Sequence, residues 1–152
     1  MSDRIRVLFV CTHNSARSQI AEALLTQEGG DDFEAHSAGT DATSVRPEAI
    51  AVLAESGIDW SGRESKTIDR FLAQSFDYVI TVCDRAKATC PVFPGAASTL
   101  HWSLDDPSEV EGTEAERLDA FRRTKAEIEA RLRPFVEVAL RASRRPPGSA
   151  LP

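Results

Sequence analysis

Residues 7–25 read VLFVCTHNSARSQIAEALL and contain, without a break, a strand, a polar loop and the start of a helix. The apolar, β-branched run over residues 5–10 is typical of a strand buried on both faces, as in parallel sheets covered by helices. The loop over residues 11–18 is polar, and the helix-forming stretch after it ends at Gly29 and Gly30. This stretch therefore predicts an α/β unit.

The rest of the chain continues the alternation of strands and helices. Strands are predicted at residues 33–38, 78–82 and 98–102, and helices at residues 48–56, 67–74 and from Glu114 onward. Pro47 suits the first turn of its helix, Gly57 closes that helix, and Pro134 is expected to kink or restart the long helix.

We therefore expect an α/β fold in a single domain. It would be an open parallel sheet of about four strands with helices on both faces. Residues 1–142 would form this domain, and residues 143–152, which contain several breakers, would form a flexible C-terminal tail. In such sheets ligands bind at the carboxyl ends of the strands.

Composition and charge limit the classes of function. The chain has 152 residues, of which 41% are hydrophobic and 28% charged, and this suits one globular core. Its net charge of −6 argues against a surface that binds nucleic acid or anionic lipid, so an anion site must be local. No apolar run approaches the ~18 residues of a membrane span or resembles a signal peptide, so we expect a cytoplasmic protein. We also expect a monomer.

Cys11 and Arg17 frame a loop that suits an oxyanion. In a loop between a strand and a helix N-terminus, backbone N–H groups point at a bound anion and an arginine holds two of its oxygens. The same field stabilises a thiolate, which makes Cys11 the candidate nucleophile. The predicted substrate-binding residues are Thr12, His13, Asn14, Ser15, Ala16, Arg17 and Ser18.

The loop residues also have structural interpretations. Cys11 could be a packed core thiol and Arg17 a solvated helix residue, although core cysteines are seldom followed by so many polar or small residues. Ser18 either donates to the thiolate or caps the helix, and Asn14 either holds the loop shape or forms an ordinary turn. His13 is expected to be an exposed loop residue rather than a base.

Cys83 and Cys90 lie in a helix-capable segment that Pro91 ends. On a continuous helix their Cα atoms would be ~10.5 Å apart, whereas a disulfide tolerates ~7 Å at most. The two thiols can therefore bond only if the segment unwinds, which suits a redox switch that presents a disulfide to a reductant. Unrelated buried thiols and a zinc site are the alternatives. Zinc is disfavoured because no two cysteines have the close spacing of zinc ligands, so no metal site is predicted.

Asp106 precedes Pro107 in an acidic turn after the last predicted strand. A carboxylic acid at this end of the sheet can supply the proton that a leaving hydroxyl needs. Asp105 and Asp106 can equally open a turn or cap the next segment. The residues alone do not decide between these interpretations.

The stretch at residues 7–25, the D-D-P at residues 105–107 and the two later cysteines resemble the low-molecular-weight tyrosine phosphatase superfamily, specifically its thioredoxin-coupled arsenate reductase branch. The resemblance spans almost the whole chain and implies a low-molecular-weight phosphatase-like fold. The cysteine-five-arginine loop is shared by phosphatases and reductases, so it implies oxyanion chemistry only. For Asp106 the resemblance implies the role of general acid.

For the reductase branch the resemblance implies a relay of three cysteines. Cys11 adds to arsenic, Cys83 attacks Cys11 as arsenite leaves, and Cys90 then attacks Cys83. Thioredoxin reduces the final disulfide, and neither an organic cofactor nor a catalytic metal is expected. Two functions stay open beside it. One is a phosphatase for phosphotyrosine or a small aryl phosphate that uses Cys11, Arg17 and Asp106, and the other is a non-catalytic oxyanion or thiol sensor.

The chain departs from the family pattern in three places. Ala16 stands where some relatives carry a further cysteine, and Ser108 and Glu109 follow the Asp-Pro where phosphatases commonly carry tyrosines. Some relatives hold a monovalent cation near the residues that match Asn14, Glu22 and Ser37. Lys66 is expected to supply the positive charge in that neighbourhood here, so no bound ion is predicted.

Overall fold

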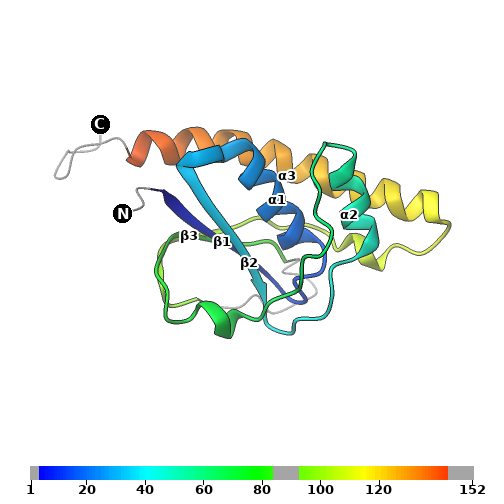
Figure 1. Ribbon diagram of the computed structural model, residues 1–152, viewed down its shortest axis with the longest axis horizontal. Helices are drawn as coiled ribbons and strands as arrows, with labels where there is room; N and C mark the ends of the chain where they lie inside the picture. Colours follow the sequence, from blue (N-terminus) through cyan, green and yellow to red (C-terminus); the bar gives the residue numbers. More distant parts are fainter. Residues whose placement is uncertain (1–3, 84–92, 144–152) are drawn as a thin grey trace.

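A computed structural model describes residues 4–83 and 93–143 as alternating strands and helices (Figure 1). The strands are β1 (Ile5–Cys11), β2 (Phe33–Gly39), β3 (Phe76–Thr81) and β4 (Ala96–His101). The α-helices are α1 (Arg17–Gly29), α2 (Pro47–Ala54) and α3 (Glu114–Ser143), and the 3-10 helices are η1 (Gly30–Asp32), η2 (Ile68–Phe71) and η3 (Pro107–Glu109). The predicted α/β class is confirmed, and each predicted strand is found within two residues of its expected bounds.

The four strands form one parallel sheet in the order β2-β1-β3-β4. All seven residues of β1 pair with β2, from Ile5 opposite Phe33 to Cys11 opposite Gly39. On its other side β1 pairs with β3 as far as Val10 opposite Thr81. Because the strands are parallel, their carboxyl ends meet at one edge, and Cys11 lies at that edge on a central strand.

Side chains of β1 alternate between two apolar layers, as the strand period of two requires. Val7 and Phe9 face the core cluster that α1, α2 and α3 complete, and these helices lie together on one side of the sheet (Figure 1). Leu8 and Val10 belong to a second, smaller cluster, which includes Phe71 of η2. Helices therefore cover both faces as predicted, but on the second face the described helix is the short η2.

The helix predicted over residues 67–74 is wrong in extent, because the structure has only η2 there. Of its predicted apolar face, Phe71 is buried in the smaller cluster, while Leu72 is 47% exposed. A longer helix would gain no further apolar contact from Leu72, and such contact is what stabilises most short helices in proteins.

Pro134 does not restart the helix, because α3 runs unbroken from Glu114 to Ser143. Leu132 and Phe135 flank the proline and both are buried against the sheet, so packing outweighs the lost backbone hydrogen bond. The expected boundary at residue 142 falls one residue before the end of this helix, so Ser143 is helical, and residues 144–152 of the predicted tail lie outside the described residues. In the described ranges no helix combines the length and the apolar character needed to cross a membrane.

Candidate active site

The loop between β1 and α1 is held from outside by its carbonyl groups. Four consecutive carbonyls, at residues 12–15, each accept a hydrogen bond from another segment. The pairs are Asp41 N to Thr12 O at 2.9 Å, Thr43 N to His13 O at 3.3 Å, Ser65 Oγ to Asn14 O at 2.7 Å and Arg46 N to Ser15 O at 2.9 Å. The acceptors of the loop are therefore engaged by its surroundings, which is the arrangement a loop needs if its N–H groups are to serve an anion.

Gly39, at the end of β2, lets the loop pack directly against the sheet. A Cβ atom at this position would lie 2.6 Å from Thr12 O and 2.8 Å from Asn14 N. Real side chains do not tolerate such distances to backbone, so the close approach of loop and strand requires glycine here.

Asn14 is the conformational centre of the loop. It is fully buried and has a positive φ of 53°, a region that asparagine adopts more readily than most residues. Its Oδ1 accepts from the backbone N–H of Lys66 at 2.8 Å, and an N–H can only donate. This contact fixes the amide so that Nδ2 donates to Ser18 Oγ at 2.7 Å.

Cys11 Sγ receives two hydrogen bonds inside the loop. Asn14 N donates to it at 3.3 Å, and Ser18 Oγ lies 2.9 Å away. Because Ser18 Oγ already accepts from Asn14, its own proton is available to the sulfur. The expectation that Ser18 donates to the thiol is therefore supported by geometry, and donors aimed at sulfur are what a thiolate nucleophile requires.

Arg17 begins α1 and connects the loop with the segment after β4. Arg17 is 6% exposed, its Nη1 donates to Leu104 O at 3.0 Å, and its Nη2 lies 3.7 Å from Asp106 Oδ2. The interpretation of Arg17 as a solvated helix residue is thus wrong. The arginine and the predicted acid lie together at the carboxyl edge of the sheet.

Asp106 caps the next segment, as one of its two interpretations predicts, and its role as an acid stays a prediction. Its Oδ1 accepts from Ser108 N at 2.9 Å and caps η3, while its other oxygen faces Arg17. The preceding residue, Asp105, is exposed.

Cys83 lies two residues after β3, beside the end of β1. The pairing of these strands continues past their last pair, because Val82 N donates to Val10 O at 2.9 Å. Cys83 is fully buried, and no disulfide joins it to Cys11. Cys90 and the predicted helical segment around it lie outside the described residues.

The remaining predicted loop residues differ in how far they are exposed. His13 is exposed as expected, and its Nδ1 lies 3.3 Å from Asp41 O. Thr12 and Ser15 are half-buried, and Ala16 is buried. None of these side chains contacts Cys11 Sγ through a hydrogen bond in the described structure.

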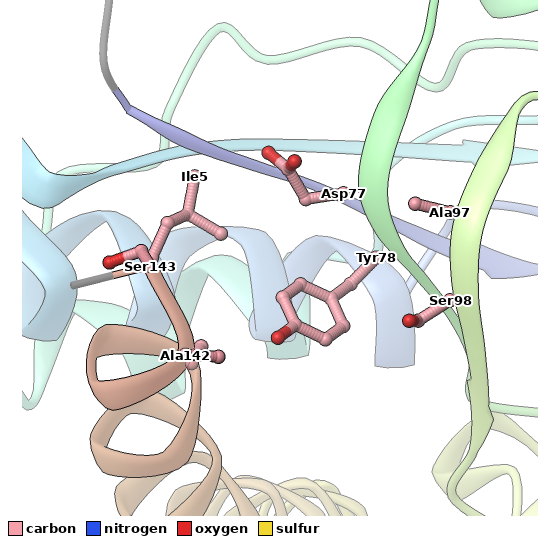
Figure 2. A pocket seen from close by; sticks show the side chains of 8 residues that line it. Ile5, Asp77, Tyr78, Ala97, Ser98, Ala142 and Ser143 are labelled. Atoms are coloured by element: carbon pink, nitrogen blue, oxygen red, sulfur yellow. The ribbon is translucent and has the colours of Figure 1, made fainter. Parts of the chain in front are cut away.

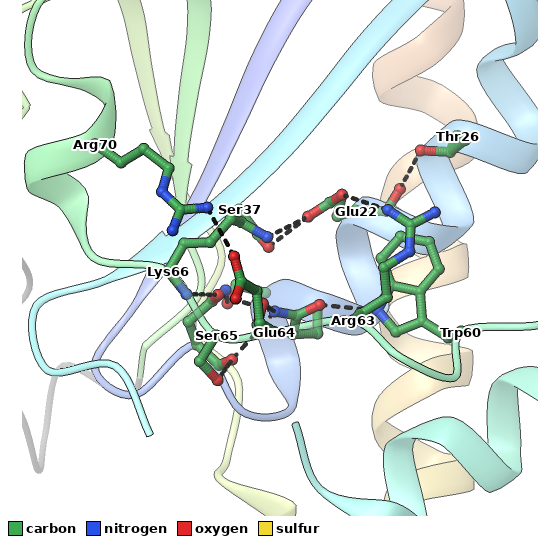
Figure 3. Close-up of polar contacts among 12 residues, drawn as sticks. Glu22, Thr26, Ser37, Trp60, Arg63, Glu64, Ser65, Lys66 and Arg70 are labelled. Carbon is green, nitrogen blue, oxygen red and sulfur yellow. Dashed lines mark hydrogen bonds and ion pairs between the residues drawn. The ribbon is translucent and has the colours of Figure 1, made fainter. Parts of the chain in front are cut away.

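Behind the loop, Lys66 contacts Glu22 as expected (Figure 3). Lys66 Nζ lies 3.4 Å from Glu22 Oε1, which also accepts from Ser37 Oγ at 2.6 Å. Arg63 lies 4.0 Å from the other oxygen of Glu22. An ammonium group thus neutralises this buried carboxylate. Within residues 4–83 and 93–143, no group of three or more His, Cys, Asp or Glu residues could hold a metal ion.

Two residues of the site, Gln19 and Trp60, were not predicted from the sequence. Gln19, fully buried on α1, donates to Asn14 Oδ1 at 2.8 Å and accepts from Trp60 Nε1 at 2.8 Å. A glutamine beside the apolar run of α1 is the signal that could have revealed a buried polar contact. No local pattern connects it with Trp60.

A pocket of about 230 Å³ lies at the opposite end of the sheet, where β1, β3 and β4 begin (Figure 2). Tyr78 points into it beside Asp77. Burial, reinforced by the charge of Asp77, raises the pKa of Tyr78. None of the predicted site residues lines this pocket, so it is distinct from the anion loop.

Comparisons with known proteins agree with this architecture. The family profile Low molecular weight phosphotyrosine protein phosphatase matches residues 6–145. An arsenate reductase of Halalkalibacterium halodurans is 42% identical over 131 residues, which cover 86% of this chain and 94% of that protein.

Two solved structures extend the comparison. One, described as an arsenate reductase in the phosphate binding state, has a TM-score of 0.75 and 32% identity and covers 88% of this chain and 97% of its own. A thioredoxin-dependent arsenate reductase of Corynebacterium glutamicum has a TM-score of 0.65 and 31% identity over 90% of this chain and 63% of its own. The anion loop, the Asp-Pro beside it and these similarities agree with one another. The chain therefore belongs to the low molecular weight phosphotyrosine protein phosphatase family.

Proposed function

We propose that the protein reduces arsenate to arsenite, with electrons from its own thiols and then from thioredoxin. The observation that carries the proposal is the position of two cysteines, Cys11 in the anion loop and Cys83 after the neighbouring strand. A phosphatase of this fold needs only the first of them. The names of the related reductases support the same assignment.

In the first step, the thiolate of Cys11 attacks arsenic. Arg17 and the loop amides hold the arsenate oxygens, and Asp106 protonates the departing hydroxyl, which leaves as water. A bond between Sγ and arsenic(V) results, and no electrons have yet been transferred.

In the second step, the thiolate of Cys83 attacks Cys11 Sγ. The sulfur–arsenic bond breaks and its electron pair stays with arsenic, which becomes arsenic(III) and leaves as arsenite. The two sulfurs are oxidised to a disulfide between Cys11 and Cys83.

In the third step, Cys90 attacks Cys83, which releases Cys11 as a thiolate and moves the disulfide to the pair Cys83 and Cys90. Thioredoxin supplies the two electrons that reduce it. No organic cofactor or catalytic metal takes part in this scheme. Because it requires reduced thiols, we assign the protein to the cytoplasm, and we propose that it acts as a monomer.

The test is anaerobic incubation with arsenate, thioredoxin, thioredoxin reductase and NADPH, with NADPH consumption as the measurement. We expect wild-type protein to consume NADPH only when arsenate is present. Cys83→Ser should abolish this turnover and keep any hydrolysis of p-nitrophenyl phosphate, because the loop, Arg17 and Asp106 are unchanged.

Two outcomes would contradict the proposal in different ways. NADPH consumption at the wild-type rate by Cys83→Ser would overturn the relay but leave a reductase. Hydrolysis of the aryl phosphate without any arsenate turnover in the wild type would identify a phosphatase, which needs Cys11, Arg17 and Asp106 alone.

A further inference from the structure

A series of hydrogen bonds between buried side chains connects Trp60 with the nucleophile, Cys11. Trp60 Nε1 donates to Gln19 Oε1 at 2.8 Å, and Gln19 Nε2 donates to Asn14 Oδ1 at 2.8 Å. Asn14 Nδ2 then donates to Ser18 Oγ at 2.7 Å, and Ser18 Oγ lies 2.9 Å from Cys11 Sγ. Trp60 is 3% exposed, and the other four residues of this series are at most 2% exposed.

The directions of the hydrogen bonds in this series are set by groups that can only donate or only accept, among them Trp60 Nε1, Lys66 N and Glu64 O. An indole N–H can only donate, so it selects the oxygen of the Gln19 amide and turns the nitrogen toward the loop. That nitrogen also donates to Glu64 O at 3.1 Å, an atom that can only accept. The amide of Gln19 therefore has one favourable orientation.

The orientation of Gln19 matters because of what it faces. A flipped amide would place Gln19 Oε1 against Asn14 Oδ1, and two acceptors would meet in a buried site. Asn14 would then have conflicting partners, because Lys66 N requires Oδ1 at the position where a flipped Gln19 would require Nδ2. An Asn14 amide displaced by this conflict would donate less well to Ser18 Oγ, and the proton of Ser18 would be held less firmly on Cys11.

We propose that Gln19 and Trp60 are positioning residues that hold the proton of Ser18 on the sulfur of Cys11 through the amide of Asn14. Neither residue touches the substrate, and each acts through its neighbour in this series. The inference rests on the proposed function only in using Cys11 as the nucleophile, so it holds for arsenate or for a phosphate ester.

Replacement of Trp60 by phenylalanine leaves the charged groups around this hydrogen-bonded series in place. The guanidinium of Arg63 lies over the Trp60 ring, 4.0 Å from its centroid, and a phenyl ring can keep that contact. Glu22 and Lys66 lie on the same flank, paired with each other. On the side of the nucleophile, Arg17 and Asp106 are the charged neighbours in the described structure, with His13 exposed at the rim.

The test uses Trp60→Phe, which removes the N–H and keeps an aromatic ring. In a Cys83→Ser, Cys90→Ser background, Cys11 is the only thiol among the 152 residues, and its reaction with iodoacetamide can be followed by mass spectrometry across pH. We expect the pH of half-maximal reactivity to rise by about 0.5–1 unit, since one unit corresponds to a tenfold shift in the balance of the two forms. With p-nitrophenyl phosphate, kcat should fall about tenfold and KM should change little.

A double-mutant cycle separates positioning from general destabilisation. If Trp60 acts through Ser18, Trp60→Phe should cause no further shift in the S18A background. Trp102→Phe is the matched control, because it makes the same change in the same core cluster, where Trp102 packs on Phe9 and Phe135. It should lower stability and leave the reactivity profile of Cys11 unchanged.

Either of two results would overturn the inference. One is an unshifted reactivity profile in folded Trp60→Phe, and the other is an equal shift in the wild-type and S18A backgrounds. Both readouts are independent of arsenate, so a failure here is distinguishable from a failure of the proposed reductase reaction.

Discussion

Asp106 uses its two carboxylate oxygens for different purposes. Oδ1 accepts from Ser108 N and begins η3, and Oδ2 lies 3.7 Å from Arg17 Nη2. A variant that keeps the first contact and removes the acid can therefore separate structure from chemistry. Asparagine is such a variant, because its side-chain oxygen can cap the same N–H.

We predict that Asp106→Asn lowers kcat by about 10²- to 10⁴-fold, the usual contribution of a general acid, and leaves the melting temperature nearly unchanged. KM should not rise, because loss of a negative charge beside Arg17 does not weaken anion binding. Steady-state kinetics and a thermal melt measure both quantities.

Asp105→Asn is the matched control, since the exposed neighbour offers the same chemical change one position earlier. It should cost little activity. Equal losses at the two positions would mean that the turn, and not the acid, is what the activity requires.

Lys66 and Glu22 form an ion pair whose members are largely withdrawn from water. Their side chains are 15% and 9% exposed. Glu22 also accepts from Ser37, and the backbone N–H of Lys66 holds Asn14. Removal of the ammonium would leave a buried carboxylate with Arg63 as its one remaining cationic neighbour among the described residues.

We predict that Lys66→Met lowers the free energy of unfolding by about 2 kcal/mol, because a buried charge loses its partner. Potassium should restore part of this loss by binding the folded state, whereas the wild type should respond equally to potassium and choline salts. Urea unfolding in the two salts measures the effect.

Lys125→Met is the control for this experiment. Lys125 is equally exposed, at 15%, but its partner Glu129 is one turn away on the surface of α3, where such pairs contribute about 0.5 kcal/mol or less. An Lys66→Met variant as stable as the control would show that Glu22 does not depend on the ammonium.

At the scale of elements, α3 contains an interior proline that its packing tolerates. Pro134 is exposed, while the nearby Leu132 and Phe135 bury their side chains in the core cluster. The proline removes one backbone donor and adds steric conflict with the preceding turn.

We predict that Pro134→Ala stabilises the protein by about 1–3 kcal/mol, the cost of an interior proline less the gain in unfolded-state entropy. Urea unfolding is the measurement, and Arg133→Ala, at the adjacent exposed position, should change stability by less than about 0.5 kcal/mol. No gain from Pro134→Ala would mean that α3 is already free of strain at this point.

Elements could be predicted from sequence where the signal is local. The strand at residues 5–10, the loop and α1 follow one another in a single stretch, so apolar runs and breakers are enough to find them. The failure at residues 67–74 has a tertiary cause, because only packing decides that Phe71 is buried and Leu72 is not. A periodic pattern does not contain that information.

The same distinction applies to the whole molecule. Cys11, Arg17 and Ser18 are close in sequence, and a strand-loop-helix motif was sufficient to bring them together as a site. The contact of Arg17 with Leu104 and the hydrogen bond from Trp60 to Gln19 join distant parts of the chain, and no spacing rule predicts them. The grouping of the loop residues could thus be predicted from sequence, whereas the contacts that distant segments make with them could not.

The position of Cys11 at the end of a strand bordered on both sides has a consequence for motion. β1 pairs along its whole length with β2 and from Val7 to Val10 with β3, so its end cannot advance without breaking a ladder. A disulfide needs the two sulfurs about 2.05 Å apart. In the proposed relay, Cys11 would therefore be the fixed thiol, and the thiol that moves would be Cys83, which lies beyond the end of its own strand. In kinetic terms, the rate of electron transfer to arsenic would be governed by how fast the Cys83 side of the fold delivers its sulfur.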